Sequence, residues 1–432
     1  MTLPKLIDGA VFVLFLLTLW SLDTIAGVGT NPLEIVRYGL ICGLEGIILL
    51  LAILAARREP VSLRLSVGGG LLVLFMAYTV SSVFWSAGGT QSVFKVVLQA
   101  FTLATCIAVA ALRPTRALVQ MLVAACGTVV VIGALVAIFV PSVGVETGWL
   151  LAGKWRGISV QKNSFGGLAA LSLVYAIIQL AIPPAGGRRR GALVLTTLWA
   201  GFLLLCLLMS GSRGAQLSAA LGVAGLAFTR VGRPVQNLVL FALAVVMGPI
   251  LVLAATTLSF DATQLSFAGL SFDTSSRTEI WSYGLQQLGG RELFGFGPSG
   301  FWTPERMDVF LADNGWVLDN FHSGYVTALM EGGIVGIGLL TAALVGCFSH
   351  LRKLSLNGDR WVTFTFSFFC IIVTENIVEN VFGRSTDFLF VTFLLLMLAA
   401  TAVVAPSRRT ASAGAGGLFP NLPQLHTESP NG

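Results

Sequence analysis

Long apolar runs separated by short polar loops make up most of this sequence. A helix that crosses a bilayer needs about 20 apolar residues, and we find twelve segments that fit. The first run is too long for the apolar part of a signal peptide and leads straight into the second, so we expect it to remain as a helix. The pattern predicts an all-α polytopic integral membrane protein with about 12 transmembrane helices. The predicted spans are residues 6–27, 33–55, 68–86, 93–112, 117–140, 164–182, 191–210, 214–229, 237–259, 321–348, 361–383 and 386–404.

Composition supports the membrane class and excludes others. Of 432 residues, 55% are hydrophobic and 11% are charged, whereas soluble domains carry about 25% charged residues. The net charge is +6, but the basic residues lie in short clusters between apolar runs, so we expect no nucleic-acid partner. The six cysteines are widely spaced within apolar stretches and show no metal-binding spacing. We therefore expect no metal site and no cofactor.

The basic residues instead predict the orientation of the chain. Sixteen Lys and Arg residues fall on one side of the predicted spans and eight fall in the loops of the other side. Positive residues favour the cytoplasmic side, so we expect both termini there. The domain prediction is one transmembrane domain over residues 1–404, with a long outer loop at 260–320 between spans 9 and 10. Residues 405–432, rich in Gly, Ser, Pro and Ala, are predicted to be a disordered cytoplasmic tail.

The outer loop at 260–320 is too long to be structureless and is expected to carry function. Within it, the segment 273–290 predicts a short interfacial helix. Ser276 and Glu279 have the spacing of a capping box, and Gly289–Gly290 provides a stop. This helix would place Arg277 in its first turn, where free backbone N–H groups and a guanidinium can together hold an anion.

A second outer arginine has a similar position. Ser212 can cap the helix predicted at 214–229, which leaves Arg213 at its start. Cations are disfavoured at helix N-termini, so Arg213 and Arg277 together suggest a clamp for a diphosphate, although each alone could be an ordinary surface or snorkelling arginine. Arg156 and Lys162, in WRGISVQKNSFGG, are a third candidate phosphate contact.

One of the three histidines, His322, falls on the predicted outer side. If Asn320 caps the helix that follows, His322 lies in its first turn and can act as a general base there. Asp319 could orient the imidazole. The alternative is an interfacial histidine that is hydrogen-bonded to water.

Three acidic residues fall inside the spans predicted at 321–348 and 361–383. Glu331 lies about 16 Å into its helix, where a carboxylate needs a partner or a cavity, and we favour a structural role for it. Gly332 and Gly336 beside it favour close helix packing. Glu375 and Glu379 share one face of the next span, and either a polar helix contact or a wall of the outer site would explain them.

An ordered set of motifs carries a family resemblance. WRGISVQKNSFGG, GSRGA, RTEIWSYGLQQLGGRELFGFGPSGFW and NFHSGYVTALMEGGIVGIGLL follow one another, separated by spans. The set resembles the O-antigen ligase and polysaccharide polymerase superfamily and covers most of the chain from SSVFWSAGGTQS at about residue 80 to TENIVEN. Within it, the chain looks most like exopolysaccharide polymerases of the succinoglycan type. It departs from their pattern at Gln161, where a histidine often stands, and at Ser323, where an asparagine often stands.

The resemblance implies metal-independent, inverting glycosyl transfer at the periplasmic face of a bacterial inner membrane, from a sugar chain carried on undecaprenyl diphosphate. His322 would be the catalytic base. The diphosphate would be bound by four basic residues, Arg156, Lys162, Arg213 and Arg277. Asp319, Asn320 and Glu379 would form a wall of the site. The implied partners are the lipid-linked oligosaccharide, the bilayer and a chain-length regulator or export proteins.

Two alternatives remain open. A ligase that moves the finished chain onto a lipid A core would use the same residues. A transporter or lipid flippase would also fit twelve spans with both termini on one side, but transporters tend to show repeated halves with paired charges at mid-membrane, and no repeat is visible here.

Overall fold

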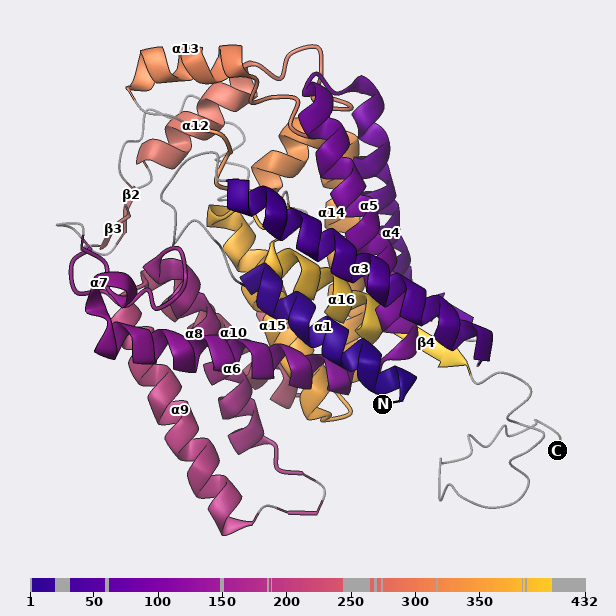
Figure 1. Ribbon diagram of the computed structural model, residues 1–432, viewed down its shortest axis with the longest axis vertical. Coiled ribbons are helices and arrows are strands. Elements are labelled where there is room, and N and C mark those ends of the chain that lie inside the picture. Colours follow the sequence, from indigo (N-terminus) through magenta and orange to yellow (C-terminus); the bar gives the residue numbers. More distant parts are fainter. Residues whose placement is uncertain are drawn as a thin grey trace.

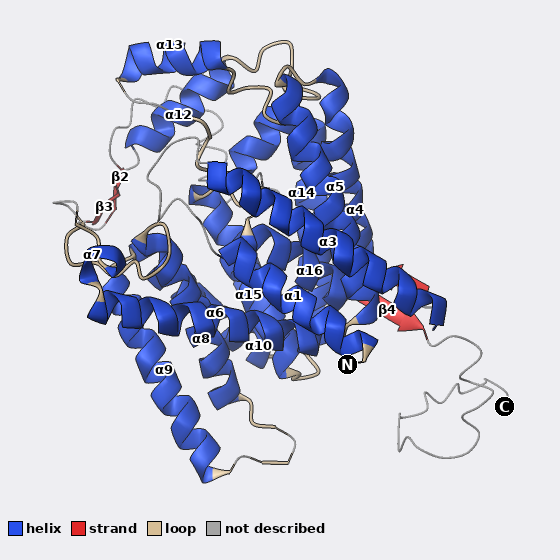
Figure 2. Cartoon of the chain, viewed as in Figure 1, coloured by secondary structure: helices blue, strands red, loops and turns tan. Residues whose placement is uncertain are grey.

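The computed structural model describes residues 2–19, 32–58, 62–147, 151–184, 186–187, 189–243, 265–267, 270–272, 275–315, 318–382, 384 and 387–405. The described chain is mainly helical, as Figures 1 and 2 show, and its strands form two small antiparallel pairs. The helices are α1 (Leu3–Leu19), α3 (Pro32–Arg58), α4 (Val67–Ser81), the 3₁₀ helix η1 (Ser82–Trp85), α5 (Gly89–Leu112), α6 (Thr115–Phe139), α7 (Pro141–Gly144), α8 (Lys162–Ala181), α9 (Arg190–Ser210), α10 (Arg213–Arg230), α12 (Ser275–Gln286), α13 (Pro304–Asn314), α14 (Gly324–Ser355), α15 (Arg360–Val378) and α16 (Phe388–Thr401). The strands are β1 (Ser62–Leu65), β2 (Leu265–Phe267), β3 (Leu270–Phe272) and β4 (Ala402–Ala405).

The polytopic membrane class is confirmed in its general form. Seven described helices are long and apolar enough to cross a membrane. Of the other five predicted spans, the one at 237–259 begins in a described helix at 233–243 and then leaves the described residues. The remaining four coincide with α1, α10, α15 and α16, which are not among these seven.

The last predicted span, 386–404, is wrong in length. Helix α16 has 14 residues, about 21 Å at 1.5 Å per residue, and is too short to cross a hydrocarbon core of about 30 Å. Its residues are buried on almost every side, so its apolar sequence reflects a place inside the bundle. The chain then enters β4, which pairs antiparallel with β1 from Ala402 opposite Leu65 to Ala405 opposite Ser62. Residue 405 is therefore part of a strand, and the rest of the predicted tail, 406–432, lies outside the described residues.

The segment predicted as an outer loop contains regular structure. Helices α12 and α13 lie across one end of the bundle, as Figure 1 shows, while the start of α1 and β4 lie toward the other end. Strands β2 and β3 form a hairpin in the same segment. The helix predicted at 273–290 is confirmed as α12, but it begins at Ser275, so Ser276 lies inside the helix and is not its N-cap.

Helix α14 is broken in its middle. Gly333 has φ 62° and ψ −163°, a conformation essentially restricted to glycine. In an unbroken helix the carbonyls of Met330 and Glu331 would accept hydrogen bonds from the next turn. Here the backbone N–H groups of Phe296 and Gly297 bind those carbonyls at 2.8 and 2.9 Å.

The other side of the break is satisfied by the same loop. The N–H groups of Ile334 and Val335 donate to the carbonyls of Glu292 and Leu293, at 2.8 and 3.2 Å. The hydroxyl of Tyr78 in α4 donates to the carbonyl of Gly332 at 2.6 Å. Residues 291–300, hereafter the wedge loop, thus enter the break and bind the backbone groups that it exposes.

Candidate functional site

The segment 318–323, which carries His322, is fixed by contacts on both sides. The indole N–H of Trp281 in α12 donates to the carbonyl of Phe321 at 2.8 Å. The ring of Phe321 packs against Phe301 and Trp302, with centroids 5.0 and 5.1 Å apart. Phe321 therefore anchors the backbone directly before the histidine.

His322 itself has an unusual backbone conformation. Its φ is 46°, and Ser299 is the other described non-glycine residue with a positive φ. Such a conformation costs about 1–3 kcal/mol and often marks a functional position. The side-chain oxygen of Asn320 accepts a hydrogen bond from the His322 backbone N–H at 2.9 Å, and the Asn320 amide donates to Asp319 at 2.6 Å. Asn320 and Asp319 thus shape the turn that presents the histidine.

The prediction that Asn320 caps the helix and places His322 in its first turn is wrong. Helix α14 begins at Gly324, and the hydroxyl of Ser323 caps it by accepting from Val326 N. His322 lies one residue before the cap, outside the helix. The left-handed turn at His322 ends any helical continuation toward Asn320, because helix residues need a negative φ.

Hydrogen bonds to the C-terminal end of α15 fix the position of this turn. The backbone N–H of Gly324 donates to the carbonyl of Glu379 at 3.0 Å, and the Ser323 hydroxyl donates to the carbonyl of Asn376 at 3.2 Å. Glu379 therefore lies beside the start of α14, and its place in a wall of the site stays a prediction.

Arg277 lies near His322 and Glu379. It lies in the first turn of α12, as predicted, one turn before Trp281, and its Nη2 is 3.9 Å from the Glu379 carboxylate. The Nε of Arg277 is buried and has no hydrogen-bond partner among the described residues. A buried donor of this kind costs free energy unless a ligand or water binds it, so the guanidinium keeps capacity for a further anion.

Charge and burial together favour the neutral imidazole. Burial, and then the positive charges of Arg277 and Arg384, lower the pKa of His322 below its usual value, while Asp319 raises it to a smaller extent. A neutral imidazole can accept a proton. Arg384 was not predicted as a site residue and was only one of the eight basic residues in the loops of the predicted outer side. The one signal that could have identified it is its position shortly after TENIVEN.

The other predicted phosphate contacts form a neighbouring group. Arg213 begins α10, and Ser212 caps that helix by accepting from Ala215 N at 3.3 Å, as predicted. Lys162 begins α8, and its ammonium donates to the carbonyl of Gly211 at 3.2 Å. The Arg156 guanidinium donates to the carbonyl of Val143 at 2.8 Å, so this residue is engaged in holding its own loop.

Helices α10 and α15 connect the two groups. Ser218 of α10 donates a hydrogen bond to Glu375 of α15. Arg213 lies five residues before Ser218, about 7.5 Å along its helix, and Glu379 lies four residues after Glu375, about 6 Å along the antiparallel helix. Arg213 and Glu379 therefore reach a similar level. Glu375 is a polar helix contact, whereas Glu379 lies near Arg277.

Glu331 has partners other than His322. Its carboxylate lies 2.7 and 2.9 Å from the Lys95 ammonium of α5 and accepts from the backbone N–H of Ser299 at 3.0 Å. The structural role that we favoured for Glu331 agrees with these contacts. Gly332 and Gly336 both lie against the ring of Tyr78, as the close-packing prediction required.

Two cavities are found elsewhere on the described chain. One is lined by residues of α6, α8 and α9, and the other by Trp85 with residues 290–295. Neither is lined by His322 or Arg277. In the described residues no group of three or more His, Cys, Asp or Glu side chains is arranged to hold a metal ion.

Comparisons with known proteins agree with the ordered motifs. Residues 198–341 match a family model described as O-antigen ligase, a stretch that contains Arg213, Arg277 and His322. The chain is also 26% identical over 214 residues to the exopolysaccharide production protein ExoQ of Rhizobium meliloti (strain 1021). That alignment covers 47% of this chain and 48% of the relative, about half the length of each. The resemblance to the O-antigen ligase and polysaccharide polymerase superfamily, and to its succinoglycan type, is confirmed.

Proposed function

On the premise of this superfamily resemblance, we propose that the protein is a polymerase that joins undecaprenyl-diphosphate-linked oligosaccharide repeat units into an exopolysaccharide. The two matches support a function of the O-antigen ligase or polymerase type. The polymerase is preferred because the curated relative is named for exopolysaccharide production. The reaction would take place at the periplasmic face of a bacterial inner membrane, with both termini in the cytoplasm.

The proposed reaction is a single inverting displacement without a metal ion. The acceptor hydroxyl oxygen attacks the anomeric carbon of the donor sugar, and the bond from that carbon to the diphosphate oxygen breaks. His322 takes the hydroxyl proton. The lipid diphosphate leaves with an additional negative charge, which Arg277 and Arg213 stabilise. Arg156 and Lys162 are proposed as further diphosphate contacts, and Asp319, Asn320 and Glu379 as the wall that orients the histidine.

The observation that carries the proposal is the convergence of Arg277 and His322. Trp281 bonds to the residue before His322, and Arg277 lies one turn away on the same helix. Arg277 is close enough for its charge to lower the pKa of the histidine, and its buried Nε is free of partners among the described residues. A neutral base beside an anion-binding guanidinium is what this displacement needs.

The family model that matches residues 198–341 is described as O-antigen ligase. This description favours one alternative, a ligase that transfers the lipid-linked chain to lipid A core. A transporter or lipid flippase is less well supported. The Lys95–Glu331 pair and the broken α14 are features that transporters also show, but here the wedge loop binds the backbone groups exposed by the break, which leaves them unavailable to a transported substrate.

The test uses purified protein with its matching lipid-linked repeat unit, without divalent metal, and a gel that resolves chain length. We expect a ladder from wild type and a loss of about 10²–10⁴-fold in rate for His322→Ala and about 10²–10³-fold for Arg277→Ala. His350→Ala and Arg291→Ala are the matched controls, because His350 lies near the far end of α14 and Arg291 lies in the wedge loop. Transfer of a single chain only when lipid A core is added would identify a ligase. Unchanged rates in both site variants would refute the proposed site.

A further inference from the structure

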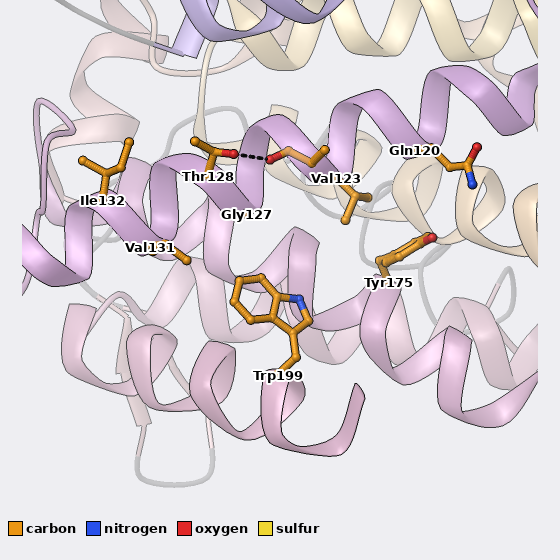
Figure 3. Close-up of a pocket in the computed structure, with 9 residues that line it drawn as sticks. Gln120, Val123, Gly127, Thr128, Val131, Ile132, Tyr175 and Trp199 are labelled. Atoms are coloured by element: carbon orange, nitrogen blue, oxygen red, sulfur yellow. Dashed lines mark hydrogen bonds between the residues drawn. The ribbon is translucent and has the colours of Figure 1, made fainter. Parts of the chain in front are cut away.

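A groove runs along α6 between α8 and α9. It encloses about 570 Å³, within the range of small-molecule pockets. Helix α6 provides one wall with Ala124, Gly127 and Thr128, and Tyr175 of α8 and Trp199 of α9 provide the other (Figure 3). A Cβ atom on Gly127 would lie 3.2 Å from the Trp199 ring, so the helix and the indole are already in close contact.

The groove is polar at one end and mainly apolar along the rest, where the Thr128 hydroxyl donates to the carbonyl of Ala124. Figure 3 shows Gln120 and Tyr175 toward one end, and Val131 and Ile132 toward the other. From Gln120 to Ile132 the helix rises about 18 Å, a little more than the roughly 15 Å that one leaflet contributes to the hydrocarbon core. A long, narrow apolar groove of this length fits a hydrocarbon chain.

Two arginines lie at the polar end. Arg116 precedes Gln120 by one turn of α6. Arg360, the first residue of α15, donates to Gln179 at 3.0 Å, one turn beyond Tyr175 on α8. The two guanidinium carbons lie 5.4 and 4.7 Å from the centroid of the same ring, that of Trp361. That ring is in turn 6.2 Å from the ring of Tyr175.

This arrangement gathers two like charges around one indole. The nearest acidic residue in the sequence, Asp359, uses its carboxylate to cap α15 by accepting from Trp361 N and Val362 N. Among the described residues no salt bridge joins Arg116 or Arg360 to an acidic side chain, so an anion at the polar end of the groove would relieve their repulsion.

The groove is open to the bilayer. Helix α9 leans away from the bundle in Figure 1, and the described residues cover little of the half of α9 nearest Arg190. Leu193, Val194, Leu195 and Leu198 there keep 45–70% of their surface exposed. A lipid can reach the groove sideways between α6 and α9.

We propose that this groove binds an anionic phospholipid from the leaflet that lies level with Arg116 and Arg360. The headgroup phosphate contacts the two guanidinium groups, and one acyl chain lies along α6 against Gly127 and Trp199. Basic pockets between membrane helices commonly select anionic headgroups. A zwitterionic lipid is selected against, because its ammonium group would face the same two arginines.

The test measures lipid retention by the purified full-length protein in native mass spectrometry. Phosphatidylglycerol and phosphatidylcholine with identical acyl chains compete at equal concentration. We expect about tenfold preference for phosphatidylglycerol, which Arg116→Gln/Arg360→Gln reduces to about equal retention. Ala124→Phe, which fills the groove, reduces retention of both lipids. Arg58→Gln and Ala100→Phe, at exposed positions on α3 and α5, are the matched controls and retain the preference.

Three outcomes overturn the proposal. Equal retention of the two lipids by wild type would show that the arginines select no headgroup. Unchanged preference in the double arginine variant, with its thermal midpoint also unchanged, would place the lipid elsewhere. Glycerol 3-phosphate, offered as a probe of the headgroup alone, is expected to compete less than one tenth as well as the lipid, because the apolar groove contributes to binding. Equal competition would reduce the site to a phosphate site and contradict the lipid assignment.

Discussion

The ammonium of Lys95 in α5 lies 2.7 Å from the carboxylate of Glu331 in α14, directly before the break at Gly333. The same carboxylate accepts from the backbone of Ser299 in the wedge loop. One acidic side chain therefore connects a neighbouring helix, the broken helix and the loop that enters the break. Both side chains are about 80% buried, so each charge depends on the other.

The first prediction concerns this pair. Lys95→Met is expected to destabilise the fold by about 3 kcal/mol, because it leaves a largely buried carboxylate without its cation. Adding Glu331→Gln should recover a good part of that loss, since the amide keeps a hydrogen-bond acceptor for Ser299. Thermal midpoints in detergent measure both effects. A double variant no more stable than the single one would show that the ion pair does not carry the coupling.

The second prediction concerns the break itself. Gly333→Ala should destabilise the protein by more than about 2 kcal/mol, because its backbone conformation is nearly glycine-specific and a Cβ would overlap the carbonyl of Leu293. Gly338→Ala on the same helix has open space around it and should be neutral or slightly stabilising, because alanine favours the helix. Comparison of the two thermal midpoints checks the prediction, and similar values would argue against a fixed break.

The third prediction is a pH dependence. His322 acts as a base only when neutral, so turnover should fall as the pH drops through its lowered pKa. Arg384→Gln removes a positive charge that lowers this pKa, so the acidic limb of the pH–rate profile should move to higher pH. Asp319→Asn removes the opposing charge and should move it to lower pH. Limbs that do not move in either variant would mean that His322 is not the titrating base.

The fourth prediction tests how the histidine is positioned. Trp281→Phe keeps an aromatic ring but removes the hydrogen bond to Phe321, and we expect about tenfold slower turnover with little change in KM, because small misplacements of catalytic groups lower the rate. Trp302→Phe is the control, since the Trp302 indole N–H is buried without a hydrogen-bond partner among the described residues. Loss of the Trp302 indole N–H should therefore leave the rate unchanged. Equal effects of the two substitutions would point to general loss of packing.

Local patterns predicted much of the fold and several parts of the site. The position of Arg213 at a helix start follows from its capping residue Ser212, and that of Arg277 from the apolar periodicity of its helix, although Ser276 is not the cap. The cap of α14 was misplaced because Asn320 and Ser323 are both good caps, and the choice depends on a left-handed turn at His322 that α15 and α12 hold in place. The sequence near His322 contains no sign of those contacts.

Contacts between residues far apart in the sequence could not be predicted from such local patterns. Lys95 and Glu331 are 236 residues apart, and each alone is only an ionisable residue inside a predicted span. Gly332 and Gly336 were predicted to favour close helix packing, which agrees with their contacts to Tyr78, but the break at Gly333 was not predicted. The break at Gly333 requires the wedge loop as its partner, and that loop has no apolar periodicity of its own.

The broken α14 also has a consequence for the order in which the chain is made. The groups shown to satisfy its break and its carboxylate, from Tyr78, Lys95 and residues 292–299, all precede Gly333 in the sequence. Synthesis proceeds from the N-terminus, so each of these partners exists before the ribosome reaches the break. The helix can adopt its final bent form as it emerges, without an interval in which its backbone groups wait for a segment still to be translated.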